Sequence, residues 1–135
     1  MKLGTFNHIA LTVTNLARSE AFYDKLLGFM GYKQAEKNEN FILWANSHNG
    51  AVITISPSNP QSSNKFHDRY SPGLHHLAFG ADSRDDVNKL YKFLVEQGTE
   101  ILDPPSEYDY MPGYYAVFFL DPDGIKLELT YIPNW

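Results

Sequence analysis

The sequence predicts an α+β fold built from two similar modules in tandem, each with one strand, one helix and three further strands. The segment that begins at Asn7, NHIALTVTNLARSEAFYDKLLGFMGY, has the same order of features as the segment HHLAFGADSRDDVNKLYKFLVEQGTE that begins at His75. The ends of the two halves also agree, because NGAVITIS from Asn49 matches DGIKLELT from Asp123. A repeat that agrees in strand, helix and final turn predicts two copies of one unit within the 135 residues.

Each half is expected to open with a short apolar strand and a helix of about a dozen residues. Asn15 and Ser83 precede the helical patterns and are residue types that cap a helix N-terminus. Gly28 and Gly98 are the expected left-handed stops. The helices therefore occupy equivalent places in the two modules.

The rest of each half is expected to end in a strand that opens with a turn pair, Asn-Gly at 49–50 and Asp-Gly at 123–124. A segment rich in Pro, Ser and Asn separates the halves, which gives module 1 at about 5–57, a linker at 58–73 and module 2 at about 74–135. The second half holds extra residues, which we assign to the tyrosine-rich segment PPSEYDYMPGYY at 104–115.

Composition excludes several classes of function. The net charge is −5 and there is no run of Lys or Arg, which argues against nucleic acid and anionic membranes as partners. No apolar stretch approaches the roughly 20 residues of a transmembrane helix, and the N-terminus lacks a signal-peptide core. The absence of cysteine excludes a disulfide framework and thiolate chemistry. We expect a cytoplasmic protein.

One face of the expected strands carries possible ligands. Because side chains alternate along a strand, His75 is expected on the core-facing side together with Leu77. His76 is expected on the other face. The repeat makes His8 equivalent to His76, and Thr54 equivalent to Glu128, the other candidate ligand. These faces are either simply solvated or walls of a cavity where two imidazoles and a carboxylate converge on a divalent metal.

The segments FNHIALTVTNLARSEAFYDKLLGF, LHHLAFGADS and FFLDPDGIKLELTY resemble the vicinal oxygen chelate superfamily. That superfamily includes glyoxalase I, extradiol dioxygenases, fosfomycin-inactivating transferases and bleomycin-resistance proteins. The resemblance covers essentially the whole chain and implies a single domain of two βαβββ modules. It also implies one divalent ion per chain (Zn, Ni, Mn or Fe) with the ligands His8, His76 and Glu128.

Two positions depart from subgroups of that family. Thr54 stands where glyoxalase I has a fourth ligand, a Glu or a His, and a threonine hydroxyl is a weak ligand for such metals. Ala10 stands where the fosfomycin transferases usually have a catalytic threonine. The reaction subclass (lyase or isomerase, dioxygenase, transferase) is therefore open.

The resemblance implies an enzyme that binds a small-molecule substrate through two neighbouring oxygens on the metal. Glu128 is the candidate catalytic residue, either as a ligand or as a base released from the metal. Lys126 on the same face either holds an anionic substrate group or extends to solvent. The alternative class is a metal-free binding protein of the bleomycin-resistance type, since an acidic, aromatic chain suits a cationic ligand.

We expect a homodimer, in which the metal site lies within one chain or is shared between two. Five aromatic and methionine residues of the second half either close over the pocket or line the dimer interface: Tyr108, Tyr110, Met111, Tyr114 and Tyr115.

Overall fold

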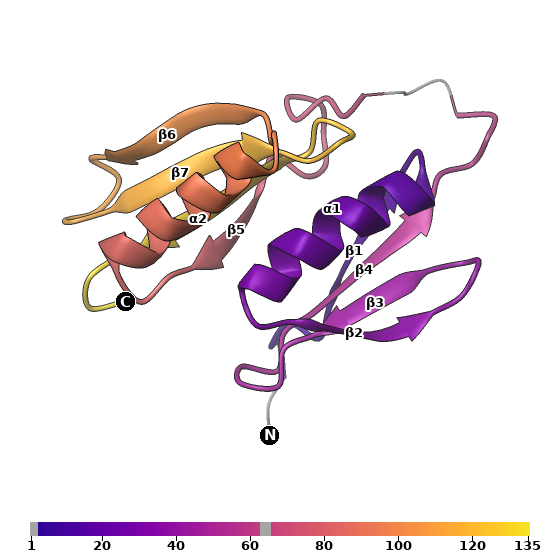
Figure 1. Ribbon diagram of the computed structural model, residues 1–135, viewed down its shortest axis with the longest axis horizontal. Helices are drawn as coiled ribbons and strands as arrows, with labels where there is room; N and C mark the ends of the chain where they lie inside the picture. The colour runs from indigo at the N-terminus through magenta and orange to yellow at the C-terminus, as the bar shows by residue number, and fades with distance from the viewer. Residues whose placement is uncertain (1–2, 63–65) are drawn as a thin grey trace. The chain divides into compact units, whose positions relative to one another are not determined.

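The computed structural model describes residues 3–62 and 66–135, which form two units, Met1–Lys65 and Phe66–Trp135. Each unit contains a strand, a helix and three strands, so the predicted α+β fold of two βαβββ modules is confirmed (Figure 1). The elements are β1 (Ile9–Val13), α1 (Leu16–Phe29), β2 (Lys33–Lys37), β3 (Ile42–Ala45), β4 (Val52–Pro57), β5 (Leu77–Gly80), α2 (Arg84–Glu96), β6 (Ile101–Glu107), β7 (Tyr115–Leu120) and β8 (Lys126–Tyr131). No helix in the described ranges has the length and apolar character needed to cross a membrane.

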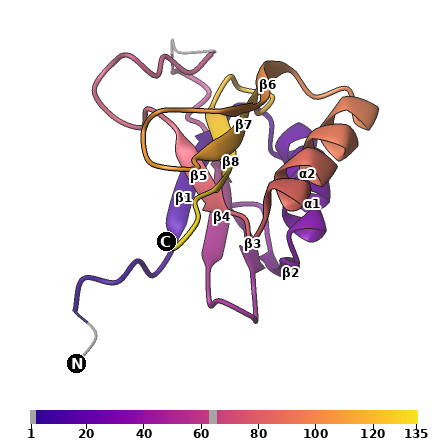
Figure 2. The ribbon, with the colours of Figure 1, turned by 90° about the vertical axis from the view of Figure 1, so that its left-hand side faces the viewer.

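The first unit is a four-stranded sheet in the order β1-β4-β3-β2 with α1 along one face (Figures 1 and 2). β1 runs parallel to β4 and places Ala10 opposite Thr54, while the other neighbours are antiparallel. The sheet face that α1 covers is apolar, as the alternation predicts. The buried residues of this face and of the helix include Leu11, Val13, Ile42, Trp44, Ile53, Ile55, Tyr23, Leu26 and Leu27. The opposite face is left for His8, Ala10 and Thr54.

The second unit repeats this arrangement with the order β5-β8-β7-β6 and with α2 packed against β6, β7 and β8 (Figure 1). β5 runs parallel to β8, and Ala78 lies opposite Glu128. The pair Ala78–Glu128 is thus the counterpart of Ala10–Thr54 in the first sheet. The repeat found in the sequence holds to the level of strand register.

Both helices begin where the sequence predicts. The side chain of Asn15 accepts a hydrogen bond from the Arg18 amide, and Ser83 accepts one from the Asp86 amide. The Asn15 and Ser83 caps are therefore confirmed.

One of the two predicted helix stops is confirmed and the other is wrong. Gly98 is left-handed at φ 74°, as predicted, but α1 continues through Gly28, and the left-handed residue is Gly31 at φ 89°. The amide of the residue after each left-handed glycine reaches back five residues, from Tyr32 to Leu27 and from Thr99 to Leu94. The Gly28 prediction is wrong because the left-handed position follows the cap residue, and in the first helix only Gly31 stands there.

The segment before β5 belongs to the second unit. The amide of His67 donates to the carbonyl of Asp123 at 2.8 Å, and His67 Nε2 lies 2.7 Å from the Leu74 carbonyl oxygen. Gly124 is left-handed at φ 80°, and a Cβ there would collide with the Phe66 ring. These contacts hold Phe66 and His67 against the turn before β8 and join His67 to Leu74, which precedes β5.

Candidate metal centre

His76 and Glu128 meet on the face of the second sheet that points away from α2. His76 lies directly before β5, and its ring reaches the carboxylate of Glu128, which stands opposite Ala78 in the sheet. His76 Nε2 lies 3.1 Å from Glu128 Oε2. The Glu128 side chain is 1% exposed and the His76 side chain 34%, so a buried carboxylate is joined to an imidazole that solvent reaches.

The second oxygen of Glu128 also has a partner. The hydroxyl of Tyr114, from the loop between β6 and β7, donates a hydrogen bond to Glu128 Oε1. Burial, followed by the hydrogen bond to Glu128, raises the pKa of Tyr114 to about 12. The hydroxyl therefore keeps its proton at neutral pH and acts as a donor. Both oxygens of a buried carboxylate are thereby satisfied, as a folded protein requires.

His75 contacts His76 from the other side. The two Nδ1 atoms lie 2.7 Å apart, and the rings meet edge to face with centroids 5.0 Å apart. Only one of two facing ring nitrogens can carry the shared proton. When His76 Nδ1 is the donor, a neutral His76 has a free lone pair on Nε2. When His75 is the donor, His76 Nε2 carries the proton and donates it to Glu128.

The position of His75 contradicts the prediction that strand alternation places it on the core-facing side. His75 is exposed and does not enter the core with Leu77. The reason is local, because β5 begins at Leu77, and strict alternation does not extend to a residue outside the strand.

His8 lies in the first unit, directly before β1, and is exposed. Its Nδ1 lies 2.8 Å from Asn7 Oδ1, an oxygen that only accepts, so Nδ1 carries the proton and Nε2 a lone pair. Thr54, on the same face, is partly buried. His8 thus has the register position and a free ring nitrogen suited to a metal ligand.

The donor chemistry of His76, Glu128 and His8 suits a borderline divalent ion, because imidazole nitrogen and carboxylate oxygen are its usual ligands. The structure brings two of the three together, since His76 and Glu128 lie in one unit and His8 in the other. Among residues 3–62 and 66–135, there is no group of three or more His, Asp or Glu placed to hold an ion. The second unit alone therefore offers a pair of ligand atoms rather than a full set.

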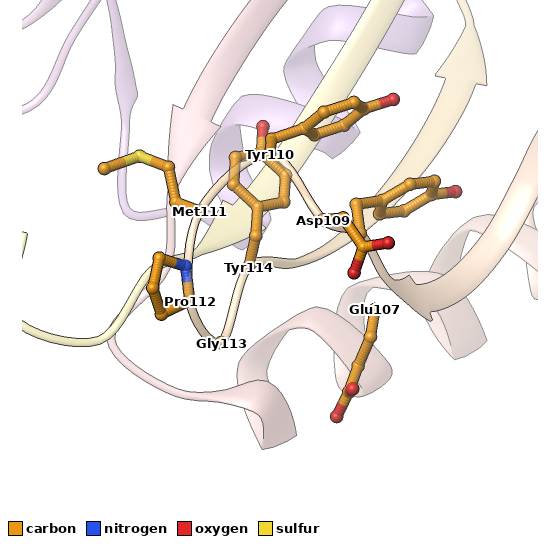
Figure 3. Close-up of a pocket in the computed structure, with 8 residues that line it drawn as sticks. Glu107, Asp109, Tyr110, Met111, Pro112, Gly113 and Tyr114 are labelled. Atoms are coloured by element: carbon orange, nitrogen blue, oxygen red, sulfur yellow. The ribbon is translucent and has the colours of Figure 1, made fainter.

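The tyrosine-rich loop forms an aromatic wall beside this pair. The rings of Tyr108 and Tyr110 are stacked with centroids 5.3 Å apart, and the Tyr114 ring stands perpendicular to both. Residues 107–114 line an open pocket of about 340 Å³, where Tyr110 and Tyr114 lie close together and Met111 points away from them (Figure 3). Tyr108 also contacts Phe118, whose ring centroid lies 6.3 Å from that of His76.

Sequence reasoning named Tyr114 as one of several loop aromatics but missed its bond to Glu128. It also missed the contact between His75 and His76. The density of tyrosine in a segment absent from the first module was the available signal. Nothing in the pattern distinguishes Tyr114 from Tyr110 or Tyr115.

Known proteins share this fold and much of this sequence. A crystal structure of a putative glyoxalase from Bacillus halodurans superposes with a TM-score of 0.82 at 31% identity, covering 96% of this chain and 97% of that one. The uncharacterized protein YqjT of Bacillus subtilis is 35% identical over 92% of this chain and 96% of its own length. The metallothiol transferase FosB of Bacillus licheniformis is 27% identical over 95% of this chain and 75% of its own length.

The sequence profile of one superfamily matches residues 5–129, nearly the whole chain. The match includes both repeats, and with them His8, His76 and Glu128. The two βαβββ units described above and the similarity to the Bacillus halodurans structure agree with it. The chain belongs to the Glyoxalase/Bleomycin resistance protein/Dioxygenase superfamily.

Proposed function

We propose that this protein is a divalent-metal-dependent enzyme that binds a small molecule through two neighbouring oxygens. The observation that carries the proposal is the 3.1 Å approach of His76 Nε2 to Glu128 Oε2 on one sheet face. Two ligand atoms of a single ion lie at about this separation when each is at a normal bond length from it. The pair also occupies the register positions that correspond to His8 and Thr54 in the first unit.

His8, His76 and Glu128 would hold one ion per chain, of Zn, Ni, Mn or Fe. The bound ion would supply Lewis acidity, which stabilises negative charge on the oxygens of the substrate. Three protein ligands leave coordination positions for two substrate oxygens. Thr54 is partly buried on the corresponding face and adds no strong ligand.

The surrounding residues prepare this site. Tyr114 holds Oε1 of Glu128, which leaves Oε2 for the metal or for a proton of the substrate. Glu128 is therefore our candidate for the catalytic residue, as ligand or as base. His75 contacts His76 Nδ1, and when it accepts the Nδ1 proton, the Nε2 lone pair of a neutral His76 is available to the metal. Phe118 contacts the ring of His76, and Tyr108 contacts Phe118.

The reaction subclass stays open between a lyase or isomerase, a dioxygenase and a transferase. Two relatives point in different directions, because FosB is named as a metallothiol transferase and the Bacillus halodurans protein as a putative glyoxalase. The absence of a fourth strong ligand at Thr54 favours chemistry that needs three ligands.

We further propose that the modules 5–57 and 74–135, with the linker 58–73, work as one domain in a homodimer. Neither unit holds three ligands by itself, so the set is completed when a first unit meets a second unit. A test is to unfold His8→Ala and Glu128→Ala variants and refold them together. If the site is shared between chains, each mixed dimer regains one intact metal site. If metal binding does not recover although subunit exchange is proven, all three ligands lie within one chain.

Metal titration tests the main proposal. Chelator-treated protein, purified without a metal-affinity tag and dialysed, is titrated with each of the four metals by calorimetry. We expect about one ion per chain, lost in His76→Ala and retained in the control His48→Ala, an exposed histidine of the turn before β4. Absence of binding, or equal loss in both variants, contradicts the proposal and favours the metal-free binding protein.

A further inference from the structure

The loop between β6 and β7 builds a pocket whose side chains the metal ligands do not explain. Residues 107–114 line this pocket of about 340 Å³ (Figure 3). The volume is within the range of small-molecule sites, which is roughly 300–1,000 Å³. Tyr108, Tyr110 and Tyr114 supply three rings, Glu107 and Asp109 supply two carboxylates, and no lining residue is Lys, Arg or His. The pocket therefore combines aromatic rings with negative charge.

The three rings leave one ring face open. Tyr108 and Tyr110 are parallel, with an interplanar angle of 2° and centroids 5.3 Å apart. The Tyr114 centroid lies 5.1 Å from that of Tyr110 and 6.3 Å from that of Tyr108. If Tyr114 covered the outer face of Tyr110, its distance from Tyr108 would approach the sum of the other two distances, so Tyr114 lies along the side of the stack instead. Tyr110 is 67% exposed, and its outer face is free to contact a ligand.

The two carboxylates of the pocket differ in their partners. Oε1 of Glu107 lies 2.5 Å from the Arg84 guanidinium, which compensates its charge. Asp109 is exposed and forms no ion pair within residues 3–62 and 66–135. Asp109 therefore leaves an uncompensated negative charge beside the rings.

Tyr114 is the most strongly polarised of the three rings. Its hydroxyl donates to the buried carboxylate of Glu128. Hydrogen bonds polarise the groups that they join, so donation to an anion raises the electron density of the phenol ring. A ring with higher electron density attracts a cation more strongly. The same hydroxyl joins the pocket to the candidate metal centre, because Tyr114 lines the one and contacts a ligand of the other.

We propose that Tyr108, Tyr110 and Tyr114, together with Asp109, form a subsite that binds a quaternary ammonium group of the small molecule. Such a group is attracted to ring faces and has no N–H that needs an acceptor. A primary ammonium has three donors, which ring faces do not satisfy. As a statement of substrate class this proposal rests on the proposed function, whereas binding of the ammonium group by the rings does not require the metal.

The test uses chelator-treated, dialysed protein at constant ionic strength with choline as the probe. Two further probes are the uncharged isostere dimethylbutanol, in which carbon replaces the nitrogen, and ethanolamine, which carries a primary ammonium. The titrations are followed by NMR of protein labelled with ¹³C in the tyrosine rings. Choline should give saturable shifts of the ring signals. Ethanolamine should bind more weakly, and dimethylbutanol at least about tenfold more weakly than choline.

Variants of the loop separate the ring from the hydroxyl. Tyr110→Leu should weaken choline binding about three- to tenfold, whereas Tyr110→Phe keeps the ring and should stay within about twofold of the wild type. Asp109→Asn should weaken binding about two- to fivefold because it removes the free charge. The matched controls are Tyr70→Leu and Asp82→Asn, which change exposed residues outside the pocket and should leave the affinity unchanged. Thermal unfolding checks that each variant folds.

The outcomes separate the subsite from the metal centre. The subsite is contradicted by absence of saturable choline binding, by equal binding of dimethylbutanol, or by an unchanged affinity in Tyr110→Leu. A loss in Tyr110→Phe or Tyr70→Leu as large as that in Tyr110→Leu also contradicts it. Choline binding by a protein that binds no metal contradicts only the proposed function, whereas metal binding without choline binding contradicts only the subsite.

Discussion

The two modules share topology and register but differ in what surrounds their equivalent ligand positions. His76 contacts Glu128 and His75, whereas His8, its counterpart, is exposed and bonded to Asn7. Thr54 takes the place of Glu128 in the first sheet. The comparison teaches that the repeated fold sets equivalent strand positions in the two modules, and that the side chains around those positions differ.

The connecting loops account for much of this difference. Residues 38–41 join β2 to β3 by a tight turn in which the Asn38 side chain accepts from the amides of Asn40 and Phe41. Residues 108–114 join β6 to β7 by a longer loop that brings the Tyr114 hydroxyl to Glu128. Extra length in one loop thus supplies the donor that a buried carboxylate needs.

The largest loss of metal affinity is expected at Glu128. Among the positions of the first sheet, only His8 should show a comparable loss. Glu128→Gln keeps the size of the side chain but removes its charge, and should weaken divalent metal binding by at least about 100-fold. Calorimetric titration measures the loss. A glutamine variant with near-native affinity would show that this carboxylate is not a ligand.

The loop difference is tested at Tyr114. Tyr114→Phe removes the hydroxyl that holds Glu128 Oε1 and should weaken metal binding about tenfold, because the carboxylate loses its fixed orientation. The matched control is Tyr115→Phe, whose hydroxyl donates to Asn88 at 2.7 Å, away from the site. Equal losses of metal affinity in the two variants would contradict a specific role for Tyr114.

The pH dependence of stability gives Tyr114 a second readout. Its pKa is raised from 10.0 to about 12, so the neutral form is favoured in the folded protein. The associated stability is fully present below about pH 10 and is lost as the pH rises through about 12. Urea unfolding across this window should show a steeper loss of stability for the wild type than for Tyr114→Phe.

A smaller effect is expected at His75, whose counterpart in the first module is Asn7, the residue bonded to His8 Nδ1. His75→Ala removes the partner of His76 Nδ1 and should weaken metal binding about two- to tenfold. Restoration of the affinity in His75→Asn, whose side-chain oxygen can accept from Nδ1, would support a positioning role. An alanine variant with unchanged affinity would contradict it.

The smallest effect is expected at Thr54. Because a hydroxyl is a weak ligand for these metals, Thr54→Ala should change the affinity by less than about threefold. A large loss of metal affinity in Thr54→Ala, measured by titration, would show that the first sheet supplies a fourth ligand.

The sequence was sufficient for the fold and for the equivalence of positions, but only for part of the site. The repeat predicted that Thr54 and Glu128 are equivalent, and the registers agree, because Ala10 lies opposite Thr54 and Ala78 opposite Glu128. The local pattern could not choose between Gly28 and Gly31 as the helix stop. Contacts made by loops, such as Tyr114 with Glu128, lie outside any periodicity and need the three-dimensional path of the chain.

Arg69 shows the same limit. A linker of polar residues gives no periodic signal, so its path before β5 and the burial of the Arg69 Nε could not be read from composition. Lys126 could be assigned to a strand face, where it either holds an anionic substrate group or extends to solvent. The side-chain contacts of residues on irregular segments, such as that of Tyr114 with Glu128, are therefore found only in the structure.

The central claim is that one imidazole from each module binds the same ion, and counting histidine ligands tests it most directly. Protein labelled with ¹⁵N on histidine is loaded with Mn²⁺ and studied by pulsed electron paramagnetic resonance. We predict two coordinated imidazoles in the wild type and in His48→Ala, and no bound Mn²⁺ in His76→Ala. A single imidazole in the wild type, or a count that does not fall in His8→Ala, would contradict the claim.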